Sequence, residues 1–538
     1  MTVSVKSSFD VVVVGAGLAG MYMLHRLRGL GLTATVLEAG DGVGGTWFWN
    51  RYPGARVDVE SLEYSYSFSQ DLEEEWEWSE RYATQPELLR YANHVADRFD
   101  LRRDIQFSTR VVSAHFDEPD TVWTVTTEAG DEVRARYCVM ATGCLSAIKE
   151  PDFPGQETFK GATYQTSRWP KAGVDFTGMR VGVIGAGSSA IQSIPIIAAQ
   201  AAQVTVFQRT PNYSVPAHNG KLAPEKVAAW KANLAENRRM ERYSAGGFLS
   251  RDGNEQLALE VSAEARRAEF ERRWAVGGFA LGGAFADLTI DAAANATAAD
   301  FVADKIRSIV KDPRTADLLT PKTYPFATKR LCVDSGYYET YNLPHVRLVD
   351  LLTTPIESLN ATGLKTTEAQ FEFDAIIFAI GFDAMTGALA RIDIRGCGGV
   401  ALKDQWADGP KAYLGLMVSG FPNLFTITGP GSPSVLSSMI VSIEQHVDFI
   451  SDCLAHMATG RLNRIEATND AQEAWVTHVN DTARDTLFPL ANSWYMGANI
   501  PGKPRVFMPY IAGVGVYREF CEGIVERGYE GFAFSPSA

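Results

Sequence analysis

The sequence predicts an α/β protein with two doubly wound, mostly parallel sheets, because two of its segments share one pattern. Residues 9–38 and residues 179–209 each open with a run of β-branched and apolar residues, which is typical of a strand buried on both faces. In each segment a glycine turn, an apolar helical stretch and a second strand follow within about 30 residues. A βαβ unit of this kind heads a Rossmann-like sheet, so the two units predict two Rossmann-like domains.

Size, charge and cysteine content limit the classes of protein to consider. The chain has 538 residues, which suits two or three domains. Its formal net charge of −14 disfavours a nucleic-acid partner, because an acidic surface repels phosphate backbones. The six cysteines include no C-x-x-C pair, which predicts no metal site and the reduced thiols of a cytoplasmic protein. We find neither a signal-peptide pattern nor an apolar run of about 18 residues, and therefore expect no membrane segment.

The first glycine motif places Gly15, Gly17 and Gly20 in G-x-G-x-x-G spacing between a strand and a helix. In this motif the first glycine permits the tight turn, the second lets the backbone approach a pyrophosphate, and the third lets the helix pack on the strand. The pyrophosphate then meets free N–H groups at the positive end of the helix. Glu38 ends the second strand, where a carboxylate accepts from a ribose hydroxyl and disfavours a 2′-phosphate. The motif therefore predicts FAD or NAD.

The second motif repeats the spacing with Gly185, Gly187 and Ala190. Its second strand ends in Arg209 and Thr210 rather than in an acid. A guanidinium forms paired hydrogen bonds with phosphate and threonine adds a hydroxyl, which favours NADPH. The alternative is that Arg209 is a solvated charge at a strand end. Together, the two motifs predict hydride transfer from NADPH to a bound flavin.

These nucleotide sites predict how the chain is divided. Residues 223–328 are rich in Ala, Glu and Arg with helical periodicity, and we expect a helical insertion there. Strand patterns return late in the chain, so each nucleotide-binding domain is expected to have two parts. Residues 1–148 and 387–538 would form the FAD-binding domain, and residues 149–222 and 329–386 the NADPH-binding domain.

Two further stretches carry a resemblance to a known family. Residues 44–58 read GGTWFWNRYPGARVD, and residues 159–170 read FKGATYQTSRWP. Both fit signatures of the type I Baeyer–Villiger monooxygenases, and the chain resembles this family over nearly its whole length. It is most similar to the phenylacetone and steroid monooxygenase branch through NRYPGARVDVES, FQRTP, PFATKR, GPGSPSVLSSM and SWYMGANIPGKPRVFM. One departure is Gln165, which stands where the family has a histidine.

The resemblance implies roles for individual residues. Arg330 would be the catalytic arginine, and Asp58 its carboxylate neighbour beside the cofactors. Trp494 would contact the nicotinamide-side ribose or the substrate. The residues implied to line FAD are Glu38, Gly44, Gly45, Thr46 and Trp47. Those implied to hold the phosphate of NADPH are Arg209, Thr210 and Lys329. Those implied to shape the substrate pocket are Ser434, Val435 and Leu436.

The resemblance also implies a reaction. The family inserts one oxygen atom of O2 next to a ketone carbonyl, through a peroxyflavin, and yields an ester or lactone. An always-charged arginine suits this chemistry, because it favours the peroxide anion and stabilises the oxyanion that develops on the ketone. A protonated peroxide is an electrophile, so we expect sulfide oxidation as a side activity. The resemblance further implies a monomeric protein.

Several alternatives are open at this point. Asp58 and Arg330 can form a purely structural ion pair, and each tryptophan can be a core aromatic. The chain can also be a flavin N- or S-hydroxylating monooxygenase, an NADPH-flavin reductase with uncoupled oxidase activity, or a nucleotide sensor without catalysis. Gln165 can be a neutral replacement of histidine, or it can alter hydrogen bonding so that more hydrogen peroxide escapes.

Overall fold

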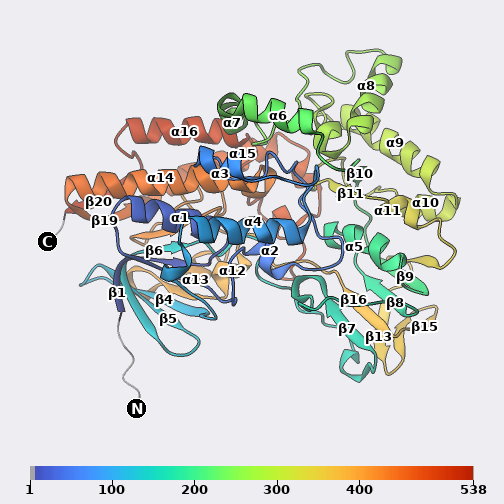
Figure 1. Ribbon diagram of the computed structural model, residues 1–538, viewed down its shortest axis with the longest axis horizontal. Coiled ribbons are helices and arrows are strands. Elements are labelled where there is room, and N and C mark those ends of the chain that lie inside the picture. Colours follow the sequence, from blue (N-terminus) through green and yellow to red (C-terminus); the bar gives the residue numbers. More distant parts are fainter. Residues whose placement is uncertain (1–6, 537–538) are drawn as a thin grey trace.

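The computed structural model describes residues 7–536, and two sheets form its framework (Figure 1). The first sheet has eight strands in the order β17-β4-β5-β6-β1-β2-β3, and β18 is also paired with β6. Its strands come from distant parts of the chain. They are β1 (Ser7–Val14), β2 (Ala34–Leu37), β3 (Ile105–Gln106), β4 (Val111–Asp117), β5 (Val122–Thr127), β6 (Glu132–Met140), β17 (Asp393–Arg395) and β18 (Leu424–Thr426).

β1 lies between β2 and β6 and runs parallel to both. Val11, Val12 and Val13 are fully buried, as expected for β-branched side chains in a strand covered on both faces. α1 (Leu18–Gly29) carries the chain from β1 to β2. The long α14 (Met439–Gly460) packs along α1, as Figure 1 shows. A helix from the C-terminal part of the chain therefore completes the cover of the N-terminal βαβ unit.

The second sheet has five parallel strands in the order β12-β9-β8-β16-β7. Its βαβ unit runs through β8, α5 (Ser188–Ala198) and β9. The strands are β7 (Ala162–Gln165), β8 (Arg180–Ile184), β9 (Gln203–Gln208), β12 (Val346–Asp350) and β16 (Ala375–Phe378). A separate antiparallel meander consists of β13 (Ile356–Asn360), β14 (Gly363–Thr366) and β15 (Gln370–Glu372). Both Rossmann-like sheets of the predicted α/β fold are present.

A helical segment leaves the second sheet after β9 and occupies the top centre and upper right of Figure 1. Residues 223–328 contain helices and no strand. β10 (Ser214–Pro216) lies before the segment and pairs in parallel with β11 (Cys332–Asp334) after it. The segment thus leaves and rejoins the body of the protein at one place. Its helices are α6 (Pro224–Ala232), α7 (Leu234–Tyr243), α8 (Ala263–Val276), α9 (Ala292–Ile309) and α10 (Pro313–Leu319).

Shorter elements and the C-terminal helices fill the space around the sheets. The other α-helices are α2 (Thr46–Trp49), α3 (Gln70–Glu75), α4 (Gln85–Arg98), α11 (Tyr337–Thr340), α12 (Gly387–Ala390), α13 (Leu402–Gln405), α15 (Asn469–Arg484) and α16 (Val514–Glu526). β19 (Leu462–Ala467) and β20 (Phe532–Pro536) form an antiparallel pair. The 3-10 helices are Arg102–Asp104, Gln156–Thr158, Thr166–Arg168, Gly278–Gly283, Cys397–Gly399, Ser434–Leu436, Phe488–Leu490 and Trp494–Met496.

The origin of the strands bears on the division into domains. The first sheet takes its strands from residues 7–140 and 393–426, and the second from residues 162–208 and 346–378. These strands fall within the predicted parts of the two domains, while the boundaries themselves stay a prediction.

Over the described part of the chain, no helix has the length and apolar character required to cross a membrane. The same residues contain no cluster of three His, Cys, Asp or Glu side chains suited to a metal ion.

Candidate active site

The glycine turn between β1 and α1 leaves no room for side chains. Gly15 has a φ of 105°, and a Cβ atom on it would lie 2.6 Å from the carbonyl oxygen of Ala141. A Cβ atom on Gly20 would lie 1.8 Å from the carbonyl oxygen of Gly15, so α1 packs directly on the turn. Gly17 begins α1 without a side-chain cap, and the N–H groups of the first helical turn are available to an anion.

A second glycine pair lies against this turn. Gly44 donates its N–H to the carbonyl oxygen of Ala16 at 3.0 Å. A Cβ atom on Gly45, which has a φ of 52°, would lie 2.8 Å from the Cα atom of Gly17. Thr46, at the start of α2, is exposed. The two glycine segments therefore form one continuous backbone surface beside the start of α1.

Trp47 follows in α2 and is buried. Its indole Nε1 donates to the hydroxyl of Tyr64 at 3.2 Å, and its carbonyl oxygen accepts from the side chain of Gln85. Tyr64 and Gln85 therefore hold the indole and the backbone of Trp47 in place. The sequence analysis singled out neither residue.

Glu38 is buried directly after β2, with 5% of its surface exposed. One carboxylate oxygen accepts from the N–H of Ala16 and the other from the N–H of Gly40, both at 2.7 Å. Glu38 thus holds the glycine turn in addition to any contact with a ribose. Each carboxylate oxygen has a second lone pair, so these bonds leave it able to accept from a ribose hydroxyl as well.

The second glycine turn repeats this construction between β8 and α5. Gly185 has a φ of 131°, and a Cβ atom on it would lie 2.2 Å from the carbonyl oxygen of Ala379. Ala190 is fully buried where α5 packs on the sheet. Gly187 begins α5 without a side-chain cap, and a Cβ atom on it would meet no atom within 4 Å. The start of α5 thus faces open space, as an anion-binding helix terminus requires.

Three cations gather near the end of β9. Arg209 is exposed and Thr210 is half-buried beside it. Burial, and then the nearby charge of Arg209, lower the pKa of Lys329 to about 8, and the same two causes lower the pKa of Lys149. Over residues 7–536, no carboxylate forms an ion pair with any of these three cations. Such a group of unpaired cations suits a phosphate, which is the ligand expected from Arg209. Sequence reasoning missed Lys149, whose surrounding residues carry no phosphate-binding motif.

Arg330 and Asp58 meet across 272 positions of sequence. Arg330 Nε donates to one carboxylate oxygen of Asp58 at 2.5 Å, and Nη2 donates to the other at 2.8 Å. The two side chains are 22% and 26% exposed. Burial opposes the charge of Arg330, but the adjacent Asp58 carboxylate outweighs it and holds the pKa of Arg330 above its ordinary value. The guanidinium is therefore permanently charged and held in one orientation.

Aromatic side chains surround this ion pair. The ring of Phe279 lies 4.9 Å from Arg330 Cζ, in a cation–π arrangement. Burial raises the pKa of the Tyr64 hydroxyl to about 12, and burial also raises the pKa of Tyr495. Both phenols therefore stay neutral at ordinary pH. Sequence reasoning missed all three residues, because an isolated Phe or Tyr carries no signal of its position in space.

The predicted pocket segment reaches the same place. Ser434, Val435 and Leu436 form a short 3-10 helix, and the carbonyl oxygen of Val435 accepts from Arg330 Nη1 at 2.8 Å. Ser434 is fully buried, has a φ of 30° and has a hydroxyl without a hydrogen-bond partner within the described residues. Val435, Leu436 and Trp494 belong to one apolar cluster. The structure thus brings the predicted pocket residues together beside Arg330.

Gln165 lies at the end of β7 and is almost completely buried. Its side-chain amide donates to the carbonyl oxygen of Lys149 at 2.7 Å. Lys149 Nζ in turn donates to the carbonyl oxygen of Asn499 at 3.3 Å. Gln165 therefore helps to hold the segment that carries one of the three cations, a task that a neutral amide can perform. Its effect on the escape of hydrogen peroxide stays a prediction.

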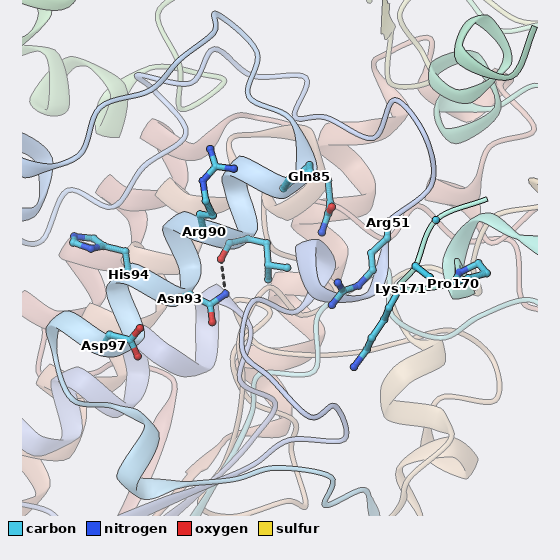
Figure 2. Close-up of a pocket in the computed structure, with 12 residues that line it drawn as sticks. Arg51, Gln85, Arg90, Asn93, His94, Asp97, Pro170 and Lys171 are labelled. Carbon is cyan, nitrogen blue, oxygen red and sulfur yellow. Dashed lines mark hydrogen bonds between the residues drawn. The ribbon is translucent and has the colours of Figure 1, made fainter. Parts of the chain in front are cut away.

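A cleft of about 790 Å³ lies between α4 and residues 170–173 (Figure 2). It borders the glycine segment through Gln85, but no residue that contacts Arg330 lines it. Lys171 is paired with Asp41, and Asp97 with Arg102. The residues that line the cleft are Arg51, Gln85, Pro86, Leu89, Arg90, Asn93, His94, Asp97, Pro170, Lys171, Ala172 and Gly173.

The two glycine turns fit two dinucleotides. Each turn opens on an uncapped helix start, and any side chain larger than hydrogen at Gly15, Gly45 or Gly185 would collide with neighbouring backbone. The first site adds the Glu38 carboxylate, which suits an unphosphorylated ribose, and the second adds the three cations, which suit an extra phosphate.

Comparisons with known proteins agree with this arrangement. Residues 12–243 match the family model described as pyridine nucleotide-disulphide oxidoreductase. A solved structure named as oxidized steroid monooxygenase bound to NADP has a TM-score of 0.95 and 54% identity, and the match covers 99% of this chain and 100% of that one. A Baeyer–Villiger monooxygenase from Pseudooceanicola batsensis is 42% identical over 98% of this chain and 96% of its own. The chain belongs to the Baeyer–Villiger monooxygenases.

Membership of this family establishes the reaction and the cofactors. The chain is a flavin monooxygenase that binds FAD, consumes NADPH and inserts one oxygen atom of O2 beside a ketone carbonyl, giving an ester or lactone. This chain also has a relative with another named activity. A phenazine N-monooxygenase from Lysobacter antibioticus is 42% identical to this chain, over 98% of this chain and 97% of its own.

Proposed function

We propose that Arg330 and Asp58 form the centre at which this Baeyer–Villiger monooxygenase oxidises its ketone. One observation carries the proposal: a charged guanidinium is held by a carboxylate through two hydrogen bonds, next to an apolar cluster. A guanidinium has five N–H groups, and three of those on Arg330 are used by Asp58 and Val435. The remaining two are available to an oxygen atom of the substrate.

FAD, reduced by NADPH, supplies the activated oxygen when both are bound. The free donors of Arg330 stabilise negative charge where it develops, including on the oxygen of the attacked carbonyl. Asp58 orients the guanidinium and balances its charge, which limits the cost of keeping that charge in a largely buried site. The surrounding aromatic and apolar side chains exclude water, which would otherwise divert the oxidant to hydrogen peroxide.

The remaining predicted residues divide between the two cofactors and the substrate. The residues that hold FAD are Gly15, Gly17, Gly20, Glu38, Gly44, Gly45, Thr46 and Trp47, with Asp58 beside the flavin. The residues that hold NADPH are Gly185, Gly187, Ala190, Arg209, Thr210 and Lys329, with Trp494 at the nicotinamide end. The ketone lies against Ser434, Val435 and Leu436. Three observations support this division. The glycine turns leave no room for side chains, and three cations gather near the end of β9. The carbonyl oxygen of Val435 contacts Arg330.

Sulfides are proposed as secondary substrates, because the same oxidant acts as an electrophile when it carries a proton. We also propose that the protein works as a monomer in the cytoplasm. Its six cysteines are all free and five are buried, which suits a reducing compartment.

Oxidation at nitrogen is the second candidate activity. It is favoured by the 42% identity to a protein named as a phenazine N-monooxygenase, which is as high as the identity to the named Baeyer–Villiger relative. Oxidation of an aromatic ring nitrogen attacks no carbonyl and develops no oxyanion on one, so this activity would not depend on Arg330.

The deciding experiment compares products. Purified enzyme with FAD and NADPH is given phenylacetone, a thioether or phenazine, and the ester, sulfoxide and N-oxide are each quantified against hydrogen peroxide. We expect ester to account for most of the NADPH consumed with the ketone. N-oxide from phenazine without ester from any ketone would overturn the ketone proposal in favour of nitrogen oxidation. Hydrogen peroxide equal to the NADPH consumed, with every substrate, would leave only the reductase alternative.

A further inference from the structure

A loop of the helical insertion packs against the aromatic ring that contacts Arg330. This loop, residues 246–250, follows α7 and carries Phe248, which is buried. The rings of Phe248 and Phe279 lie 5.4 Å apart between centroids, and Phe279 is the ring that lies under Arg330. A shift of the loop would therefore move the aromatic side chains next to the guanidinium.

The loop is held by one carboxylate. Glu63 Oε1 accepts from the N–H of Leu249 at 2.8 Å and from the N–H of Ser250 at 2.9 Å. Glu63 Oε2 accepts from the hydroxyl of Ser250 at 2.8 Å. Three donors from two adjacent residues thus converge on a side chain with 4% of its surface exposed. Two of these donors are backbone groups, so the contact fixes the path of the main chain and not only one side chain.

The same short segment also provides Asp58. Glu63 lies five positions after Asp58, and its own N–H donates to the carbonyl oxygen of Glu60 at 3.0 Å, in a tight turn. One end of the segment therefore orients Arg330 and the other end holds the loop that carries Phe248. Segment 58–63 thus contacts both Arg330 and the loop that carries Phe248.

Hydrogen bonds alone stabilise the Glu63 carboxylate. Over residues 7–536 no cation forms an ion pair with Glu63, whereas Glu60 pairs with both Arg81 and Lys226. Burial, and then the nearby Glu60 carboxylate, raise the pKa of Glu63 to about 7, although the donors of the loop oppose this rise. A carboxyl group without a counter-ion depends on these donors, so Glu63 and the loop stabilise each other.

We propose that Glu63 is a positioning residue of the oxygenation site, which holds residues 248–250 and thereby keeps Phe248 against Phe279 and Arg330. This inference rests on the proposed role of Arg330 in ketone oxidation. Glu63 touches neither cofactor site described above. Its effect should therefore fall on the fit of the ketone and leave the binding of FAD and NADPH unchanged.

The test uses the holoenzyme with Glu63→Ala, Glu63→Gln and Ser250→Ala. We expect Glu63→Ala to raise the KM for phenylacetone about tenfold, since the loop loses three hydrogen bonds. The KM for NADPH and the flavin content should not change. Glu63→Gln keeps one oxygen for the two backbone donors and should restore most of the loss, and Ser250→Ala should have an intermediate effect. Hydrogen exchange of residues 246–252 should rise in the same order.

Glu87 offers a matched control. It is equally buried and accepts from the backbone N–H of Ser79 at 2.9 Å and from its hydroxyl at 2.7 Å, away from the loop. Glu87→Ala should leave the KM for phenylacetone and the exchange of the loop as in the wild type. An equal rise in KM for Glu87→Ala and Glu63→Ala would overturn the proposal, as would unchanged loop exchange in Glu63→Ala. If Glu63→Ala does not fold, Glu63→Gln and Ser250→Ala decide the question.

Failure of the two proposals is distinguishable. If the wild type makes no ester from any ketone, the proposed role of Arg330 fails before any variant is compared. The exchange of the loop still reports whether Glu63 holds residues 246–250. If the wild type makes ester and Arg330→Ala does not, but the Glu63 variants keep the wild-type KM, only the inference about Glu63 fails.

Discussion

At the residue scale, the contact between Arg330 and Asp58 gives the sharpest prediction. Arg330→Ala should lower ester formation by about a hundredfold or more, because it removes the donors that stabilise developing negative charge. Reduction of the flavin by NADPH should persist, since the three cations that suit its phosphate do not include Arg330. Ester is measured by gas chromatography, and flavin reduction by anaerobic stopped flow.

Arg347→Ala is the control for this variant. Arg347 lies in β12 of the second sheet and contacts the ring of Phe371 in β15, far in sequence from the Asp58 segment. Its loss should change neither the rate of ester formation nor the rate of flavin reduction. Ester formation by Arg330→Ala at the wild-type rate would show that the guanidinium does not act in the reaction.

The charge of Lys329 predicts a dependence on pH. Its pKa of about 8 lies below the ordinary value, so the free enzyme loses this charge as the pH rises through 8. A bound phosphate favours the charged form, and the affinity for NADPH should therefore fall above that pH. The KM for NADPH should rise from about pH 7.5 to about pH 9.5, while the KM for NADH, which lacks the phosphate, should change little. Lys329→Arg should flatten the profile, because a guanidinium stays charged. Parallel profiles for the two nucleotides would contradict the assignment.

At the element scale, the close packing of α1 on the glycine turn predicts that the first nucleotide site tolerates no side chain at Gly20. In Gly20→Ala the new Cβ atom would lie 1.8 Å from the carbonyl oxygen of Gly15, so helix and turn must separate. We expect the protein to be purified without its yellow flavin, or with FAD that is readily lost. The FAD content is read from the absorbance spectrum.

Gly29→Ala, at the other end of the same helix, is the matched control. A Cβ atom there meets nothing within 4 Å. This change should retain FAD and raise stability by up to about 1 kcal/mol, because alanine favours a helix over glycine. A full complement of FAD in Gly20→Ala would show that the turn tolerates the displacement.

Elements of this kind were predictable because their signals are local. Gly15, Gly17 and Gly20 form a motif whose spacing can be read within six residues, and Arg209 stands at a fixed place after its glycine motif. By contrast, the hold of Glu38 on the turn depends on its rotamer and on backbone donors that no spacing reveals. Residue type therefore predicted where Glu38 lies, but not all that it does.

At the scale of the whole molecule, the contact between the two dinucleotide-binding units predicts a variant that affects their cooperation. Gln192, on α5, accepts from the hydroxyl of Tyr52 at 2.9 Å and donates to the carbonyl oxygen of Arg56 at 3.2 Å. A Cβ atom on Gly54 would lie 2.2 Å from the carbonyl oxygen of Gln192, so the two units touch closely. Gln192→Ala should slow flavin reduction by NADPH several-fold, because it loosens their relative placement.

Gln200→Ala is the control, since this side chain follows the same helix but holds the N–H of Phe176 instead. FAD content and the Kd for NADP+ should be unchanged in both variants, so that only the rate of reduction separates them. An unchanged rate in Gln192→Ala would mean that the contact does not set the distance between the cofactors.

Long-range assembly is also where prediction from sequence stopped. Lys149 and Phe279 come from two distant parts of the chain and meet the predicted Arg209 and Arg330 only after folding, and Glu63 meets the loop at Leu249 in the same way. Arg330 and Asp58 were paired only through the family resemblance, because they lie 272 positions apart and the residues between them carry no sign of their contact. The glycine motifs, whose spacing is visible within a few residues, were predictable from the residues themselves.

The parallel pairing of β10 with β11 brings the two ends of the helical insertion together at one place. Its two ends are fastened together by Ser214 and Asp334, and Arg330 lies just outside it, next to β11. Residues 223–328 could therefore be exchanged for those of a relative through a single junction, provided that the relative also supplies the ring on Arg330 and the loop donors to Glu63. A chimera built in this way would change the helices around the site and keep Arg330 and Asp58 themselves, which offers a modular route to enzymes that accept different ketones.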